Sequence, residues 1–563
     1  MQPSSDENGE PRRNNLRRYG PIAGIVVVLA LVVGASVILR GGDDDSGATA
    51  AEGEIPPDEL PDGVVTWSMA QDQGLDAQFM DTCDESDGHV AIPFFFRTEC
   101  VANVDDNGGA TAPGVTGDEI TVVVWLPNQD DAIYAFLKQA LGFTDTVDDM
   151  QATQEGLAEI FQSYYQTYGR TVRLEFLQAS GQITDSVAAR ADAVRAAEMD
   201  PFAVLGGPLL ANTWTEELHA RHLPCLACPG ISDPAPDAYG LIPTDRQSRL
   251  QIVNYVTEKL AGNPVEFAGD DLVGQDRVFG LLKLATNEGD RNDAQDLSDD
   301  LADQGVDLAA TSVFELSLGS TQENAVTAVT QMRDAGVTTV LVDADPINLG
   351  DITREATKQG WFPEWVIAGP SLLDTTVGGG LQDPEQWRHA FGISWLPPAA
   401  APEINPAYQL YQWYHGTPPP APGSLLLTYP QIALFFTALE FAGPDLTPET
   451  LQQGLFAYPP TPRARTQPSL DYGTALYGPE HPDYGGIDDF VEIWWDPDVD
   501  VEDEFGNQHH GAYRYVDDGK RYYYNEWPHE LDVFQPDRSV TEITDPPPEE
   551  IPPDYPSPAG QPG

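Results

Sequence analysis

The sequence is poor in cysteine and in positive charge. It contains four Cys among 563 residues, and 28 Lys and Arg stand against 90 Asp and Glu, giving a formal net charge of −62. A surface this acidic repels the phosphates of nucleic acids and anionic lipid headgroups, so we expect no nucleic-acid partner. The charge excess serves either solubility, with salt screening the self-repulsion, or the capture of a cationic ligand or metal.

Motifs typical of catalysis and of cofactor binding are missing as well. The chain has no nucleophile elbow, no phosphate-binding loop before a helix and no spaced set of zinc ligands. The glycine run at 378–381 follows no predicted strand, so it is not a phosphate-binding loop. We therefore expect neither an enzyme nor a cofactor.

Two segments near the C-terminus resemble metal sites only in part. Residues 496–505 (DPDVDVEDEF) alternate aspartates as a calcium loop does, but Val501 stands where glycine is needed and Asn507 where glutamate belongs. A solvated acidic loop is the first interpretation, and a looser surface calcium site is the alternative. His509 and His510 are adjacent, so they point to opposite faces of an extended segment and lack a third spaced zinc ligand. The sequence predicts no metal site.

One long apolar run is present near the N-terminus. Residues 20–39 (GPIAGIVVVLALVVGASVIL) carry no charge, and as a helix they span about 30 Å, the thickness of a bilayer's hydrocarbon core. Four Arg precede the run within residues 1–19, and one, Arg40, follows it directly. This excess of positive charge on the N-terminal side places the N-terminus in the cytoplasm. A cleaved signal peptide is the alternative, with a candidate site at 48–50, but that site lies well past an unusually long apolar region. We predict a retained signal-anchor in the cell membrane, single-pass, with residues 1–19 as a cytoplasmic tail and an extracytoplasmic C-terminal domain.

The segments that flank the globular middle differ from it in composition. Residues 40–62 are acidic and rich in Gly, Ala and Pro, which predicts a disordered stalk. Residues 63–117 form a short N-terminal extension with two of the four cysteines. Residues 531–563 form a Pro-rich tail, which is predicted to be disordered from about Asp545 onward.

All four cysteines follow the apolar run, and a small even number in a secreted context predicts two disulfides. A Cys83–Cys100 bond would close a loop of about 17 residues and stabilise the extension by about 3 kcal/mol. Cys225 and Cys228 have the spacing of a redox motif, but such a motif opens a helix, whereas this pair ends an apolar strand before Pro229. We predict a structural disulfide here; two buried thiols or a redox site are the alternatives.

The middle of the chain alternates short apolar runs with amphipathic stretches. The runs are rich in β-branched residues, as in strands buried on both faces, and the stretches place apolar residues at helical spacing. Such alternation predicts parallel βαβ units, here in two series and therefore two lobes. The predicted strands are 120–127, 171–179, 202–207, 277–285, 308–316, 337–344 and 365–370, and the predicted helices include 185–199, 293–305, 323–336 and 351–360.

Several predicted strands end in glycine, proline and small polar residues. These ends are LGGP (205–208), ACPGISD (227–233), VDADPIN (342–348) and AGPS (368–371). Ligands of open parallel sheets bind beyond the carboxyl ends of the strands, so two lobes can present these turns to one cleft. Ordinary loop chemistry is the alternative for each turn taken alone.

Three stretches carry a resemblance to a known family. They are GVTGDEITVVVWLP, GRTVRLEFLQASGQITDSVAARADAVRAAEMDPFAVLGGP and QMRDAGVTTVLVDADPINLGDITREATKQGWFPEWVIAGPS, in this order. The order resembles the type 1 periplasmic binding proteins, and among them the substrate-binding proteins of branched-chain amino acid ABC importers. The resemblance implies an α/β fold of two doubly wound parallel-sheet lobes joined by a three-strand hinge. Its implied boundaries are 118–245 plus 368–455 for lobe 1 and 246–367 plus 456–530 for lobe 2.

The resemblance also implies a ligand site between the lobes. Members that bind amino acids hold the ligand carboxylate at two strand ends of lobe 1 and the ammonium at an aromatic and an acidic position of lobe 2. The aromatic position falls near Asp345 and the acidic one near Ser371, so this chain departs from the pattern at both. Asp345 could supply the negative charge from the other position. The implied ligand-binding residues are Asn212, Thr213, Gly230, Ser232, Asp345 and Ser371.

Aromatic residues crowd the segment 491–527 and alternate along it, which predicts a β-hairpin packed on lobe 2. Stacking on a sugar or another planar ligand is the alternative.

The predicted function is a membrane-anchored extracytoplasmic solute-binding protein that captures a small polar, amino-acid-like or amide-like ligand for an ABC importer. Its partners would be that ligand and a permease in the same membrane. A cell-surface sensor or scaffold with a degenerate cleft is the alternative.

Overall fold

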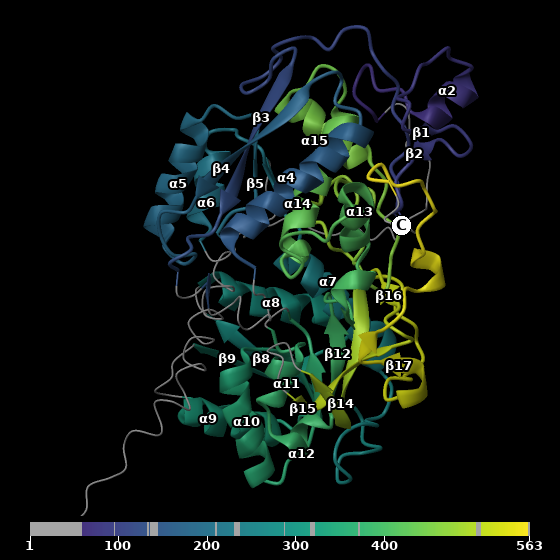
Figure 1. Cartoon of the computed structure of the whole chain (residues 1–563). Coiled ribbons are helices and arrows are strands. Elements are labelled where there is room, and N and C mark those ends of the chain that lie inside the picture. The colour runs from purple at the N-terminus through teal and green to yellow at the C-terminus, as the bar shows by residue number, and fades with distance from the viewer. Residues whose placement is uncertain are drawn as a thin grey trace, which may run out of the picture.

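The computed structural model shows two stacked lobes with a smaller extension at the side of the upper one (Figure 1). The predicted membrane helix at 20–39 lies outside the described residues. Within those residues, no helix is long and apolar enough to cross a membrane. The structure describes residues 59–94, 96–131, 134–135, 145–208, 211–229, 237–285, 288–315, 321–369, 372–502 and 508–560.

The first lobe is built on a five-stranded, fully parallel sheet with the order β4-β3-β5-β6-β7. The interior strand β3 buries every residue after its first, because helices cover both faces of the sheet. This burial explains its continuous run of apolar residues. The strands are β3 (Glu119–Leu126), β4 (Thr171–Gln178), β5 (Ala203–Leu205), β6 (Cys225–Leu226) and β7 (Ala238–Tyr239).

The helices of the first lobe come from two parts of the chain. Three follow the strands β3, β4 and β5, and three more return from a distant part of the sequence (Figure 1). The returning helix α14 is almost entirely apolar and buries Phe435 and Phe436 against the sheet. The helices are α4 (Val147–Tyr164), α5 (Ser186–Glu198), α6 (Thr213–His219), α13 (Pro406–His415), α14 (Leu425–Ala442) and α15 (Pro448–Ala457).

The second lobe holds a nine-stranded sheet. Its parallel part has the order β9-β8-β10-β11-β12, the same winding as in the first lobe, and β14, β15 and β17 extend it in antiparallel fashion. The predicted C-terminal hairpin is confirmed, since β14 pairs with β15. The strands are β8 (Phe279–Ala285), β9 (Leu308–Glu315), β10 (Thr339–Asp343), β11 (Glu364–Ile367), β12 (Ala390–Ser394), β14 (Phe490–Glu502), β15 (Gln508–Val516), β16 (Arg521–Tyr522) and β17 (Ser539–Val540).

Two apolar cores cover the two faces of this second sheet. Trp365 and Trp387 are fully buried in one of them, and Tyr255 and Phe391 in the other. The helices are α7 (Asp245–Tyr255) with the π-turn Val256–Leu260, α8 (Glu288–Asp303), α9 (Thr321–Asp334), α10 (Pro346–Lys358), α11 (Thr376–Gly380) and α12 (Pro384–Trp387).

Three crossovers connect the lobes, at residues 240–244, 395–405 and 458–489. The second crossover corrects a predicted boundary, because the sequence analysis assigned residues from 368 onward to lobe 1. Strand β12 pairs in parallel with β11, so the chain stays in the second lobe through Ser394. The run AFGIS contains Gly392 and Ser394, so its sequence did not predict a buried strand.

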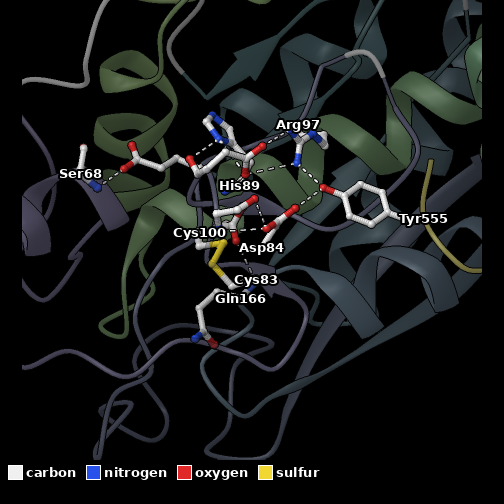
Figure 2. Close-up of a disulfide and its surroundings, with 12 residues drawn as sticks. Ser68, Cys83, Asp84, His89, Arg97, Cys100, Gln166 and Tyr555 are labelled. Carbon is white, nitrogen blue, oxygen red and sulfur yellow. Dashed lines mark hydrogen bonds and ion pairs between the residues drawn. A yellow bond between two sulfur atoms is a disulfide. The ribbon is translucent and has the colours of Figure 1, made fainter. Parts of the chain in front are cut away.

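The extension and the C-terminal tail pack together on the first lobe. Cys83 and Cys100 form the predicted disulfide, and Figure 2 shows Tyr555 of the tail beside it. The Tyr555 hydroxyl donates to Asp84 (2.8 Å) and accepts from Arg97 (2.7 Å). The predicted disorder of the tail is therefore wrong for residues 545–560, because side chains fix this Pro-rich segment. The small elements are α2 (Trp67–Gln73), β1 (Cys83–Asp84), β2 (His89–Val90), β13 (Ala399–Ala400), β18 (Glu542–Ile543) and the 3-10 turns Pro402–Ile404, Pro536–Arg538 and Pro548–Glu550.

Candidate functional site at the strand ends and the hinge

The predicted ligand residues are distributed over both lobes. Asn212 and Thr213 begin α6 of the first lobe, and Asp345 precedes α10 of the second. Each position follows a parallel strand, β5 or β10, as the sequence analysis expected. Gly230, Ser232 and Ser371 lie outside the described residues.

Asp345 has a clear role within its own lobe. It caps α10: Oδ1 accepts hydrogen bonds from the backbone N–H groups of Ile347 (3.0 Å) and Asn348 (2.9 Å), and Oδ2 accepts from the Asn348 amide (2.8 Å). The side chain is fully buried, and burial raises the pKa of its carboxyl although these hydrogen bonds oppose the rise. The carboxylate is thus engaged by its own helix.

The first-lobe positions are held by local contacts. The Thr213 hydroxyl donates to the carbonyl of Ser186 (2.7 Å), which ties α6 to α5. Trp214 is fully buried and its indole N–H donates to the carbonyl of Gly206 (3.1 Å) at the end of β5. A side chain at Gly207 would collide with this indole, because an added Cβ would lie 2.5 Å from it. The glycines of LGGP therefore permit close helix packing.

A buried ionic network that the sequence analysis missed lies in the second lobe. Lys283 of β8 places its Nζ 2.5 Å from Asp343 of β10 and 2.7 Å from Asp293 of α8. Asp293 also pairs with Arg249 of α7 (3.0 Å). Burial by itself would lower the pKa of Lys283, but the two carboxylates outweigh it and raise that pKa. The sequence signal for this network was the single Lys inside the apolar run FGLLKLA.

The hinge contains a cavity of about 260 Å³. Segments of all three crossovers line it, together with α14 and the extension. Its walls are mostly apolar and aromatic, so they suit hydrocarbon or aromatic groups rather than charged ones. Sequence reasoning could not assemble it, because its walls come from segments that are far apart in the chain. Its aromatic lining residues are Phe94, Phe96, Tyr165, Trp395, Tyr429, Tyr458 and Tyr472.

A second disulfide and a group of three aspartates also lie near the strand ends and the hinge. Cys225 and Cys228 form the predicted disulfide at the end of β6, fully buried in the first lobe. Asp471, Asp483 and Asp488 of the third crossover bring their carboxylates together, and Asp471 also lines the hinge cavity. Among the described residues, these three aspartates form the one group placed to hold a metal ion.

No protein-family model and no curated protein matches the chain. Solved structures do match. One is a branched-chain amino acid ABC transporter protein, described as putative, from Rhodospirillum rubrum, at 14% identity and TM-score 0.46, covering 67% of this chain and 97% of that chain. A second is an ABC transporter substrate-binding protein from Desulfitobacterium hafniense in complex with Leu, at 13% identity and TM-score 0.41, covering 72% and 100%. A third is a branched-chain amino acid transporter substrate-binding protein from Streptococcus pneumoniae in complex with isoleucine, at 13% identity and TM-score 0.41, covering 71% and 100%.

Two lobes with the same strand order, joined by three crossovers, are the architecture that the resemblance to type 1 periplasmic binding proteins predicts, and the solved structures that match the chain are ABC transporter proteins at low identity. Few residues are identical between these chains and this one. The assignment of the fold therefore rests on the common strand order of the two sheets and on the three crossovers.

Proposed function

We propose that the protein is an extracytoplasmic solute-binding protein that captures a small polar, amino-acid-like or amide-like molecule between its lobes. In this proposal it delivers the molecule to the permease of an ABC importer in the same membrane. The apolar run at 20–39 would hold it there as a single-pass anchor. The protein binds its ligand and does not transform it.

The repeated strand order of the two lobes supports this proposal most directly. Two sheets whose parallel parts have the same winding, joined by three crossovers, form a body that can close by hinge bending. Ligands of such sheets bind beyond the carboxyl ends of the strands. Asn212 and Thr213 follow β5 in the first lobe, and the Lys283 network lies between β8 and β10 in the second.

The cap formed by Asp345 favours a second candidate, a cell-surface sensor or scaffold of the same fold. An amino-acid binder needs an anion for the ligand ammonium, and the Asp345 carboxylate is fully buried in contacts with its own helix. A ligand without an ammonium group, or a cleft that no longer binds solutes, is consistent with this arrangement.

A thermal-shift screen of the full-length chain in mild detergent tests the first candidate. The screen covers amino acids, small amides and polyamines. A ligand at 100 times its Kd stabilises the folded state by about 2.7 kcal/mol, so a true ligand raises the Tm measurably. Small-angle scattering then checks closure, since ligand binding should reduce the radius of gyration.

Matched threonine variants locate the site. Thr213→Val should weaken binding of the identified ligand about tenfold or more, whereas Thr327→Val removes a hydroxyl that bonds only within α9 and should leave the affinity unchanged. A screen without any stabilising compound would favour the sensor or scaffold. If the Thr213→Val variant binds the ligand with unchanged affinity, the binding site lies away from the start of α6.

A further inference from the structure

Three aspartates of the third crossover converge on one point. One carboxylate oxygen from each of Asp471, Asp483 and Asp488 lies within 4.8 Å of the other two. All three side chains are buried, with exposed fractions of 2%, 5% and 0%. A narrow antiparallel ladder between 470–473 and 483–487 brings these separated positions together. The convergence is therefore built into the backbone.

Asp471 is the residue that distinguishes this cluster from a merely acidic patch. It is almost fully buried, yet neither of its carboxylate oxygens accepts a hydrogen bond of ordinary geometry. Oδ2 of Asp488 is buried without a partner in the same way. A buried carboxylate that accepts no hydrogen bond is either protonated, as an isolated group can be, or bound to a metal. Because three carboxylates converge here, one cation would compensate all of them, and these oxygens point to such a shared partner.

Gln247 and Tyr477 contact the cluster as neutral donors. The Gln247 side-chain amide donates to Oδ1 of Asp483 (2.9 Å) and to Oδ1 of Asp488 (2.7 Å). The Tyr477 hydroxyl also donates to Oδ1 of Asp488 (2.6 Å). Such bonds fix the orientation of the carboxylates, as outer contacts of metal ligands commonly do.

We propose that Asp471, Asp483 and Asp488 bind a calcium ion within the hinge. All three donors are carboxylate oxygens, which hard cations prefer, whereas zinc favours nitrogen and sulfur. Calcium takes six to eight oxygen ligands in flexible geometry, whereas magnesium demands a near-ideal octahedron and is seldom held by protein carboxylates alone. The neighbouring cavity gives room for the water ligands that complete the calcium shell.

The position of this site gives the ion a mechanical role. Gln247 belongs to the first turn of α7, directly after the first crossover, and contacts two of the proposed ligands. The Tyr472 hydroxyl donates to the carbonyl of Gly240 (2.7 Å) in that same first crossover. The ion would therefore join the first and third crossovers and stiffen the hinge between the lobes.

Calcium binding is measured on the full-length chain after removal of metals with EGTA, in about 0.3 M salt to suppress weak binding to the acidic surface. Addition of calcium should raise the Tm by several degrees. Terbium, excited through nearby tyrosines such as Tyr477, should bind at one luminescent site from which calcium displaces it. Asp471→Asn should weaken calcium binding at least tenfold. Its metal-free Tm should equal or exceed that of the wild type, because the substitution removes a buried charge.

The double variant D498N/D500N, in the exposed acidic part of β14, is the matched control and should keep the full calcium response. Asp488→Asn is the second ligand variant and should also lose it. The proposal is overturned if calcium leaves the wild-type Tm unchanged, or if Asp471→Asn binds calcium as the wild type does. An equal Tm rise with magnesium at the same concentration overturns the assignment to calcium. No solute enters this assay, so its result is independent of the proposed transport function.

Discussion

The two lobes bury charge in different ways. In the second lobe, three carboxylates face buried cations: Glu364 lies 2.9 Å from Arg277, Glu492 2.5 Å from Lys259, and Asp343 2.5 Å from Lys283. The first lobe instead buries Glu440 in the apolar helix α14, and no ion pair to it is found in the described part of the chain. Charge pairs connect the elements of the second lobe, whereas we expect the buried Glu440 to make the stability of the first lobe depend on pH.

The contacts of Glu440 explain this sensitivity. Its Oε1 accepts a hydrogen bond from the backbone N–H of Gln166 (3.0 Å), while Oε2 is buried without a partner. Burial raises the pKa of its carboxyl to about 8, although the Gln166 bond opposes the rise. Near neutral pH the folded first lobe therefore holds this carboxyl mainly in its protonated form.

Removal of the Glu364 carboxylate is expected to cause the largest loss of stability among these variants. Its carboxylate accepts hydrogen bonds from Arg277, from the backbone N–H groups of Glu266 and Phe267, and from the Thr339 hydroxyl. Glu364→Ala leaves Arg277 buried and uncompensated, so it should destabilise the second lobe by about 3–5 kcal/mol. Urea unfolding followed by tryptophan fluorescence, which reports on the buried Trp365, measures this loss.

A double variant sharpens this prediction. Replacing both partners, as in R277M/E364M, removes the uncompensated charge and should recover a large part of the lost stability. Such a recovery of stability would show that Glu364→Ala destabilises the lobe because it leaves the Arg277 charge buried without a partner, and not because it removes packing contacts. A loss below about 1 kcal/mol in Glu364→Ala would contradict the view that pairing controls the second lobe.

Substitution of Glu440 tests how charge burial in the first lobe affects stability. Because the folded pKa lies above its ordinary value of 4.5, the unfolded chain binds fewer protons than the folded one between these two pKa values. The contribution of Glu440 to stability should therefore be complete below about pH 4.5 and fall by up to about 1.4 kcal/mol per pH unit until about pH 8. Glu440→Gln should remove this slope and be the more stable form at alkaline pH.

Unfolding free energies between pH 4 and pH 9 measure the effect of Glu440→Gln. Glu159→Gln, at an exposed position of α4, is the control and should follow the wild-type curve. Parallel curves for Glu440→Gln and the wild type would mean that Glu440 titrates alike in the folded and unfolded chains.

The strands could be predicted well because a strand buried on both faces must be apolar throughout. Strand β3 illustrates this, since its predicted and observed bounds differ by one residue at each end. Strand β12 was missed because Gly392 and Ser394 interrupt its apolar run. The tail was misjudged because composition does not show the docking of Tyr555 on Arg97 and Asp84.

The candidate site was harder to predict, for two physical reasons. Asp345 followed by Pro346 is the signature of a helix N-terminus, and the cap explains the aspartate at that position. The carboxylates of Asp471, Asp483 and Asp488 meet only because a backbone ladder folds back on itself. Sequence spacing contained no sign of that ladder.

The smallest expected effect comes from an exposed pair of the first lobe. Arg190 of α5 lies 2.8 Å from Glu216 of α6, and their side chains are 49% and 60% exposed. Solvent screening limits such a pair to about 1 kcal/mol or less. Arg190→Ala should destabilise the protein slightly more than Glu216→Ala, because the chain already carries a net charge of −62 and loses a positive group. In 1 M salt, where the Debye length is about 3 Å, both losses should shrink together, whereas the Glu364→Ala loss should persist. A salt-sensitive loss in Glu364→Ala would erase the distinction between buried and exposed charge on which the comparison of the two lobes depends.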